Sequence, residues 1–143
     1  MKLVKVIDAS NHIMGRLSTH IAKELLNGEN IVIVNAEKVV ITGRKEQILA
    51  DYKQRRDRGV KGRNRRGPYY PRMPDRMLKR SIRGMLPYQE PRGRTAFRKL
   101  KVYIGVPIGM DTANIIKIDK ALDRGATRKM NLGEVSKWLG ADW

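Results

Sequence analysis

The chain has 143 residues and a net charge of +17, which favours one domain of ordinary size with a polyanion as its partner. It contains no cysteine, which excludes disulfides, thiolate zinc sites and cysteine nucleophiles. No apolar run approaches the roughly 18 residues of a membrane-spanning helix, so we expect a soluble protein with no membrane partner. The lack of cysteine fits a reducing compartment.

The positive charge is concentrated in the middle of the chain. Residues 51–100 carry 17 basic and 4 acidic side chains, whereas residues 1–50 and 101–143 each carry 7 basic and 5 acidic ones. Of those 17 basic residues 13 are arginine, whose planar guanidinium suits phosphates and base edges. We therefore expect one domain over residues 1–143 with a basic RNA-binding segment at 53–101.

The first part of the chain predicts a βαβ unit. Residues 3–8 are rich in Val and Ile, and residues 31–34 form a continuous apolar run typical of a strand buried on both faces. Between them a helix is predicted, capped by Ser10 or Asn11 and ending at Gly28, because apolar residues recur at helical spacing at Met14, Leu17, Ile21 and Leu25. A βαβ unit makes parallel strands, so the sheet should be parallel and covered by helices.

A further strand and a second helix are predicted next. Residues 39–41 are apolar, and a helix opens at Thr42–Gly43 with three residues on one side: Ile48, Leu49 and Tyr52. Residues 59–74 are punctuated by Gly and Pro, which predicts a loop with little core of its own.

The third predicted helix begins at Asp75, as its cap, and has two stripes. Its inner face is predicted to be Leu78, Ile82 and Met85, and its outer face Arg76, Arg80 and Arg83. A short helix at 95–99 and a strand at 102–104 follow. Near the C-terminus Asn131 and Glu134 resemble a capping box, with Leu132, Val135 and Leu139 on one face of the helix that it opens.

The sequence lacks the patterns of cofactor and catalytic sites. The first turn of the βαβ unit has one glycine where a dinucleotide fingerprint needs three, and no phosphate-binding loop motif occurs. His12 and His20 do not form a metal pair and are interpreted as surface or cap residues. Asp8, Ser10 and His12 are too crowded for a hydrolytic trio. We expect no cofactor, no small-molecule substrate and no catalysis.

The basic and aromatic residues of the middle segment predict a nucleic-acid-binding surface. Arginines and lysines that neutralise phosphates are interleaved with tyrosines on which unstacked bases can lie. The candidate RNA-binding residues of the loop and its flanks are Arg55, Arg56, Arg58, Lys61, Arg63, Arg65, Arg66, Tyr69, Tyr70 and Arg72. Those of the two helices that follow are Arg76, Arg80, Arg83, Arg92, Arg94, Arg98 and Lys99.

Several segments resemble large-subunit ribosomal protein thirteen. The signature-like segment consists of Arg83-Gly-Met-Leu-Pro87, Arg92-Gly-Arg94, Phe97-Arg-Lys-Leu-Lys-Val-Tyr103 and Gly105. Matching stretches near the N-terminus are Val6-Ile-Asp-Ala9, Gly15-Arg-Leu17 and Val34-Asn-Ala-Glu-Lys38 to Thr42-Gly43, so the resemblance covers residues 3–107. Arg66-Gly-Pro-Tyr-Tyr70 and Pro74-Asp-Arg76 are similar to the archaeal and eukaryotic branch, and the lack of a long basic C-terminal extension favours an archaeal source.

The resemblance implies a three-layer α/β/α fold with a four-stranded, mainly parallel sheet and a basic helix-loop segment. It implies a structural, non-catalytic constituent of the large ribosomal subunit in the cytoplasm, bound to large-subunit rRNA and neighbouring ribosomal proteins. By resemblance, Arg16 and the basic residues at Lys38 to Arg44 and at Lys45 add RNA contacts. Two alternatives stay open at this point: an RNA-modifying enzyme with a small-molecule cofactor, and a repressor that binds mRNA.

Overall fold

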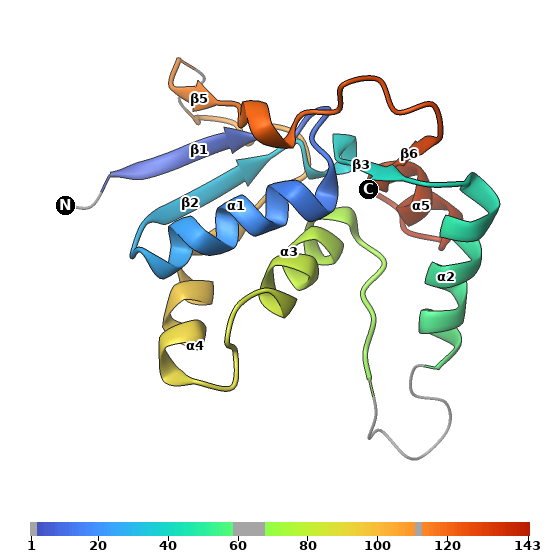
Figure 1. The fold of residues 1–143 in the computed structure, drawn as a ribbon, viewed down its shortest axis with the longest axis horizontal. Coiled ribbons are helices and arrows are strands. Elements are labelled where there is room, and N and C mark those ends of the chain that lie inside the picture. The colour runs from blue at the N-terminus through green and yellow to red at the C-terminus, as the bar shows by residue number, and fades with distance from the viewer. Residues whose placement is uncertain (1–2, 59–67, 111–112) are drawn as a thin grey trace.

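The computed structural model describes residues 3–58, 68–110 and 113–143. Its main sheet has four strands, β1 (Val4–Asp8), β2 (Asn30–Val34), β4 (Leu100–Val102) and β5 (Ile115–Ile116). They lie in the order β4-β2-β1-β5, and neighbours are parallel throughout the described sheet (Figure 1). The predicted α/β class, with three layers and a parallel four-stranded sheet, is confirmed.

Helix α1 (Met14–Leu26) connects β1 to β2 and completes the predicted βαβ unit. Leu17, Ile21 and Leu25 are buried, as the spacing predicted. The predicted cap is wrong: the N-cap residue is Ile13, and it makes no side-chain cap hydrogen bond. Ser10 and Asn11 instead belong to the turn that leaves β1, in which Asn11 has a left-handed backbone with φ of 60°.

Helices α3 (Pro74–Gly84) and α4 (Pro91–Arg98) both pack against α1 and β4. Leu78 and Ile82 are buried as predicted, but Met85 is exposed because the helix ends at Gly84 and Met85 is its C-cap. Asp75 is not the cap either, since Met73 holds that position and Pro74 begins the helix. The helix predicted at 95–99 begins earlier, at Pro91, where proline suits a first helical turn.

A second, two-stranded sheet joins distant parts of the chain. Strand β3 (Val40–Thr42) pairs antiparallel with β6 (Lys129–Asn131). Helix α2 (Lys45–Asp57) follows β3, and α5 (Leu132–Trp138) follows β6 and packs against both α2 and the short 3-10 helix η1 (Ala36–Lys38). Leu132 and Val135 are buried as predicted, whereas the capping box is absent, because Asn131 makes no side-chain cap hydrogen bond.

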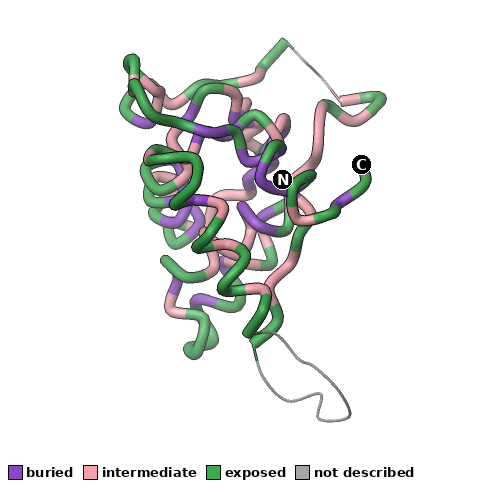
Figure 2. The backbone as a smooth tube through the Cα atoms, turned by 90° about the vertical axis from the view of Figure 1, so that its right-hand side faces the viewer, coloured by how far each residue is buried: buried purple, intermediate pink, exposed green. Residues whose placement is uncertain are grey.

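Buried residues lie in the middle of the body and exposed ones line its outside (Figure 2). The hydrophobic core contains residues of the main sheet and of helices α1 and α3. Its large, fully buried side chains include Ile7, Ile21, Ile33, Leu78 and Leu100. This rigid centre positions the polar and basic segments that surround it.

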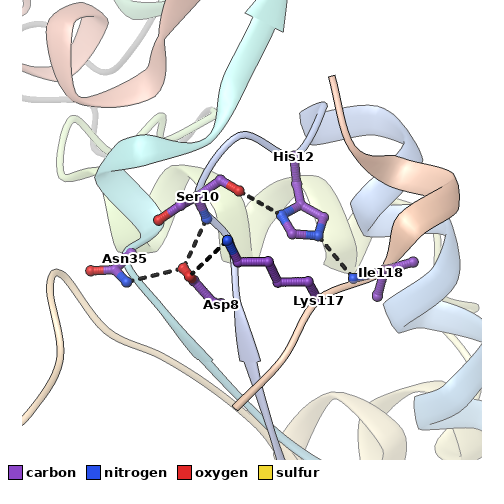
Figure 3. A network of polar contacts seen from close by, with 6 residues as sticks. All are labelled: Asp8, Ser10, His12, Asn35, Lys117 and Ile118. Atoms are coloured by element: carbon purple, nitrogen blue, oxygen red, sulfur yellow. Dashed lines mark hydrogen bonds and ion pairs between the residues drawn. The ribbon is translucent and has the colours of Figure 1, made fainter. Parts of the chain in front are cut away.

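His12 is a buried polar member of this body, so its interpretation as a surface or cap residue is wrong. The backbone N–H of Ile118, in the segment before the 3-10 helix η2 (Asp119–Ala121), donates to His12 Nε2 at 3.0 Å. The other ring nitrogen therefore carries the proton, and Nδ1 donates to the carbonyl oxygen of Ser10 at 2.9 Å (Figure 3). The neutral imidazole thus ties the C-terminal part of the chain to the end of β1.

The Asp8 carboxylate lies beside this histidine and holds the same turn. Its Oδ1 accepts hydrogen bonds from the Ser10 backbone and from Asn35 Nδ2, both at 3.0 Å (Figure 3). Burial by itself raises the pKa of Asp8, but these hydrogen bonds and Lys117, 3.9 Å from Oδ2, outweigh it and leave the pKa below its ordinary value. Asp8 is therefore a charged structural group.

Candidate nucleic-acid interface

A short segment before α3, which we call the strap (residues 68–73), lies at the centre of the candidate interface. Arg80 of α3 holds it from one side: Nη1 donates to the carbonyl oxygen of Tyr69 at 2.8 Å, and the guanidinium lies 4.3 Å from the ring centre of Tyr70. From α5, Ser136 Oγ donates to the carbonyl oxygen of Arg72 at 2.5 Å. The strap is thus fastened to two helices.

Of the two tyrosines of the strap, one is exposed and one is packed. Tyr69 is 72% exposed, so its ring is open to a partner. Tyr70 is half-buried beneath Arg80, which leaves less of its surface accessible. The aromatic residues that the sequence placed together as one stacking surface therefore have different surroundings.

Other cations of the interface also lie over aromatic rings. Lys79 Nζ is 5.1 Å from the ring centre of Phe97, and Arg83 is 5.3 Å from that of Tyr88. Phe97 of α4 and Tyr88 of the turn between α3 and α4 meet edge to face, with 5.6 Å between ring centres, so the two cations of α3 lie over a joined pair of rings. Such contacts stabilise each cation by about 0.5–1 kcal/mol when exposed and restrict its orientation. Lys79, Arg80 and Arg83 of α3 are therefore held over rings before any partner binds.

Helix α4 and its C-cap contribute four more cations, three of which are exposed. Arg92 is paired with Glu90, with 2.8 Å between Nε and Oε2, and Arg94 donates to the carbonyl oxygen of Gln89 at 3.4 Å. Arg98 is exposed near the end of the helix, and Lys99 is its half-buried C-cap. The four residues continue the positive surface beyond α3.

Two hollows flank the strap and share Pro71 and Arg80. The first has a volume of about 230 Å³ and lies between the strap, α1, α2 and α3. The second is a wider depression of about 530 Å³ on the side of α4, lined by Tyr69, Phe97 and four cations, which are Arg76, Lys79, Arg80 and Arg83. Most of the predicted residues of α2, α3 and the strap therefore line two adjoining hollows.

The first hollow also includes an aromatic residue that the sequence did not assign to RNA. Tyr52 of α2 lines it, and Arg55 lies 5.3 Å from its ring centre. Burial raises the pKa of the Tyr52 phenol, and the nearby Arg55 only partly opposes this, so the hydroxyl remains neutral. In the sequence Tyr52 shows only a helical-face pattern, which does not indicate RNA binding.

Three further predicted residues, Arg16, Arg44 and Lys45, lie apart from this surface. Arg16 lines a hollow of about 330 Å³ beside β3, and Arg44 and Lys45 line one of about 400 Å³ at the start of α2. Arg128 and Lys129 join the latter because β6 pairs with β3, and no local pattern in the sequence indicated this. Arg58 is exposed at the C-cap of α2. The predictions for Lys61, Arg63, Arg65 and Arg66 lie outside the described residues.

The described residues contain no group of three or more His, Asp or Glu side chains that could hold a metal ion. In the part of the chain that the structure describes, no helix is long and apolar enough to cross a membrane. Asp8, Ser10 and His12 lie close together, but His12 Nδ1 bonds the backbone carbonyl oxygen of Ser10, so the imidazole is not paired with the Ser10 hydroxyl as a general base would be.

The parallel α/β fold and its cations held over aromatic rings define a basic α/β protein with a cationic surface. A family model described as Ribosomal protein L13 matches residues 2–108. The large ribosomal subunit protein uL13 of Archaeoglobus fulgidus is 51% identical over 138 residues, which cover 94% of this chain and 86% of the relative. The uL13 of Methanosphaera stadtmanae is 43% identical over 140 residues, covering 97% and 99%. That of Picrophilus torridus is 51% identical over 134 residues, covering 94% and 95%.

The chain belongs to the ribosomal protein L13 family. This confirms the resemblance found in the sequence, and the archaeal relatives agree with the predicted branch. The family is one of structural, non-enzymatic ribosomal proteins, which confirms the prediction of no catalysis and excludes the RNA-modifying enzyme. The matched relatives extend over nearly the whole chain, beyond the stretch 3–107 that the sequence motifs covered.

Proposed function

We propose that this protein is a structural constituent of the large ribosomal subunit in the cytoplasm, which binds large-subunit rRNA and helps to fold and hold it during assembly. The observation that carries the proposal is the gathering of cations of α2 and α3 around the strap, four of which, Arg55, Lys79, Arg80 and Arg83, lie over aromatic rings. Cations held in place in this way lose less entropy when they bind phosphates.

The RNA-binding surface that we propose has a central part and two outlying parts. The central part comprises Arg55, Arg56, Arg58, Tyr69, Tyr70, Arg72, Arg76, Arg80, Arg83, Arg92, Arg94, Arg98 and Lys99. The outlying parts are Arg16 and the pair of Arg44 and Lys45. Lys61, Arg63, Arg65 and Arg66 are included on the ground of their charge alone. Such a surface fixes the position of the RNA, mostly through its backbone.

We also propose that residues 1–143 act as one domain. The C-terminal part supplies β5 to the sheet begun by β1 and supplies β6 as partner of β3. It also holds the strap through Ser136, whose Oγ accepts a 3.2 Å hydrogen bond from Trp143 Nε1. Through these contacts residues 108–143 support the RNA-binding surface. Their own exposed side chains are available to neighbouring ribosomal proteins.

Sucrose-gradient sedimentation of a lysate tests the proposed function. A constituent of the large subunit should sediment with that subunit and with whole ribosomes, and little should remain at the top of the gradient. Depleting the protein should lower the ratio of large to small subunits, because assembly would stall. A protein found mainly with free mRNA particles, or in the soluble fractions, would contradict the proposal.

A further inference from the structure

The hollow between the strap and helices α1, α2 and α3 combines apolar walls with a cationic rim. Its walls include Met14, Tyr52, Met77 and Leu139, which come from four distant parts of the chain. Met77 is buried in the core, and the other three pack against it, so the walls are supported from behind. The cavity is thus formed in the protein before any partner arrives.

The rim carries one sign of charge. Arg55, Arg56 and Arg80 line the hollow, and no carboxylate is among its lining residues. The two tyrosines of the hollow, Tyr52 and Tyr70, each have one of these arginines over the ring, at 5.3 and 4.3 Å. An occupant that matches both the apolar walls and the arginine rim needs a flat apolar group attached to an anion.

The volume limits the occupant further. At about 230 Å³ the hollow is smaller than the roughly 300–1,000 Å³ of typical small-molecule sites. It can hold one planar ring system but not a whole cofactor. A nucleobase attached to a sugar phosphate has this combination of one flat ring and adjacent negative charge, and aromatic side chains are its usual platform in proteins that bind unpaired RNA.

We propose that this hollow receives one unpaired, unstacked base of the large-subunit rRNA, with the adjoining phosphates on Arg55, Arg56 and Arg80. The inference rests on the proposed function and adds a site that reads the shape of the RNA, beyond contacts to its backbone. An apolar side chain of a neighbouring protein would fill the space equally well but would leave the three guanidinium groups without an anion. Charge complementarity therefore favours the base.

Gly84 offers a way to close the hollow without disturbing the core. It lines the hollow at the end of α3, and a Cβ built on it meets no atom within 4 Å. Gly84→Met should place a flexible apolar side chain in the cavity while keeping every charge. Asn27→Met is the control, because Asn27 is uncharged, is exposed at the C-cap of α1 and lines none of the hollows described above.

The experiment measures the affinity of each full-length variant for a transcript of the large-subunit rRNA, together with chemical probing of unpaired bases in the complex. Gly84→Met should weaken binding roughly 5-fold to 150-fold, the equivalent of losing one stacked base. One base that the wild-type protein protects should regain its reactivity. Asn27→Met should bind like the wild type and protect the same bases.

A second measurement uses the wild-type protein, so that its result does not depend on whether the Gly84→Met variant folds. Ultraviolet cross-linking of the wild-type complex, followed by mass spectrometry, should find a nucleotide on a peptide containing Tyr52, Tyr70 or Met77. Cross-links confined to other peptides, or wild-type affinity and protection in Gly84→Met, would overturn the base site while the proposed function stood. Failure of the wild-type protein to bind the transcript at all would overturn both.

Discussion

The guanidinium of Arg80 lies over the ring of Tyr70, with 4.3 Å between its central carbon and the ring centre, and its Nη1 bonds the neighbouring carbonyl of Tyr69. This contact joins α3 to the strap across the middle of the candidate interface. Arg76, one turn earlier on the same helix, is exposed. Two arginines that the sequence assigned to the same outward stripe therefore have different roles in the folded protein.

The first prediction separates these roles. Arg80→Ala should lower the free energy of unfolding by about 1–3 kcal/mol, because it removes a hydrogen bond from a charged donor and a cation–ring contact. Arg76→Ala should change it by less than about 0.5 kcal/mol, as exposed substitutions usually do. Urea unfolding of the two variants checks the difference. Equal stability of the two variants would mean that Arg80 does not anchor the strap.

The second prediction concerns the opposite face of α3. Leu78 is fully buried against the core, so Leu78→Ala should cost about 2–5 kcal/mol through lost burial and a residual cavity. Met85 is 43% exposed beyond the end of the helix, so Met85→Ala should cost far less. Thermal unfolding followed by circular dichroism measures both. A larger loss at Met85 would show that the two faces of the helix are misassigned.

The third prediction concerns the turn between α3 and α4. A Cβ built on Gly93 would overlap the backbone carbonyl of Pro87, and backbone cannot move aside as a flexible side chain can. Gly93→Ala should therefore destabilise the protein by about 1–3 kcal/mol, as overpacking does. At Gly84 the same change meets open space, so Gly84→Ala serves as the control in the same unfolding experiment. Equal stability of the two variants would contradict a close approach at Gly93.

The elements with a strong local pattern could be predicted from the sequence. The apolar spacing of α1 and the continuous run of β2 indicated a βαβ unit, and Leu78 and Ile82 fell on the buried face of α3 as predicted. Local spacing is sufficient in these cases because each element buries one face or one stripe by itself. The charge of the middle segment likewise needed no knowledge of contacts.

The missed features depend on partners far away in the sequence. Strand β5 has two residues and exists through pairing with β1, and β6 exists through pairing with β3. The polar ring of His12 can be buried because its acceptor nitrogen receives a hydrogen bond from the N–H of Ile118, 106 residues later. The side-chain caps failed because the N-cap positions fall on Ile13 and Met73, which a local preference for Ser, Asn or Asp does not reveal.

The fourth prediction uses the lowered pKa of Asp8. A carboxylate whose folded pKa lies below its ordinary value of about 3.8 stabilises the fold above that pH, and the stabilisation is lost as the pH falls through the folded value. Asp8→Asn should therefore be less stable than the wild type at pH 7, and the difference should shrink below pH 4. Urea unfolding at a series of pH values measures it. A constant difference from pH 7 to pH 3 would mean that the charge of Asp8 contributes nothing.

The last prediction concerns the salt dependence of rRNA binding. Each phosphate that an arginine neutralises releases condensed counterions, so the logarithm of affinity should fall linearly with the logarithm of salt concentration. For roughly six to ten phosphate contacts, the coefficient for duplex DNA gives a slope of about −5 to −9.

Arg98→Ala removes an exposed cation of α4 and should make the slope about one unit shallower. Lys120→Ala removes the same charge from η2, outside the basic segment, and should leave the slope unchanged. Filter binding of the rRNA transcript across a salt series provides these slopes. A wild-type slope near zero would contradict a phosphate-binding role for this surface, and equal effects of the two variants would mean that net charge, rather than the position of Arg98, governs the interaction.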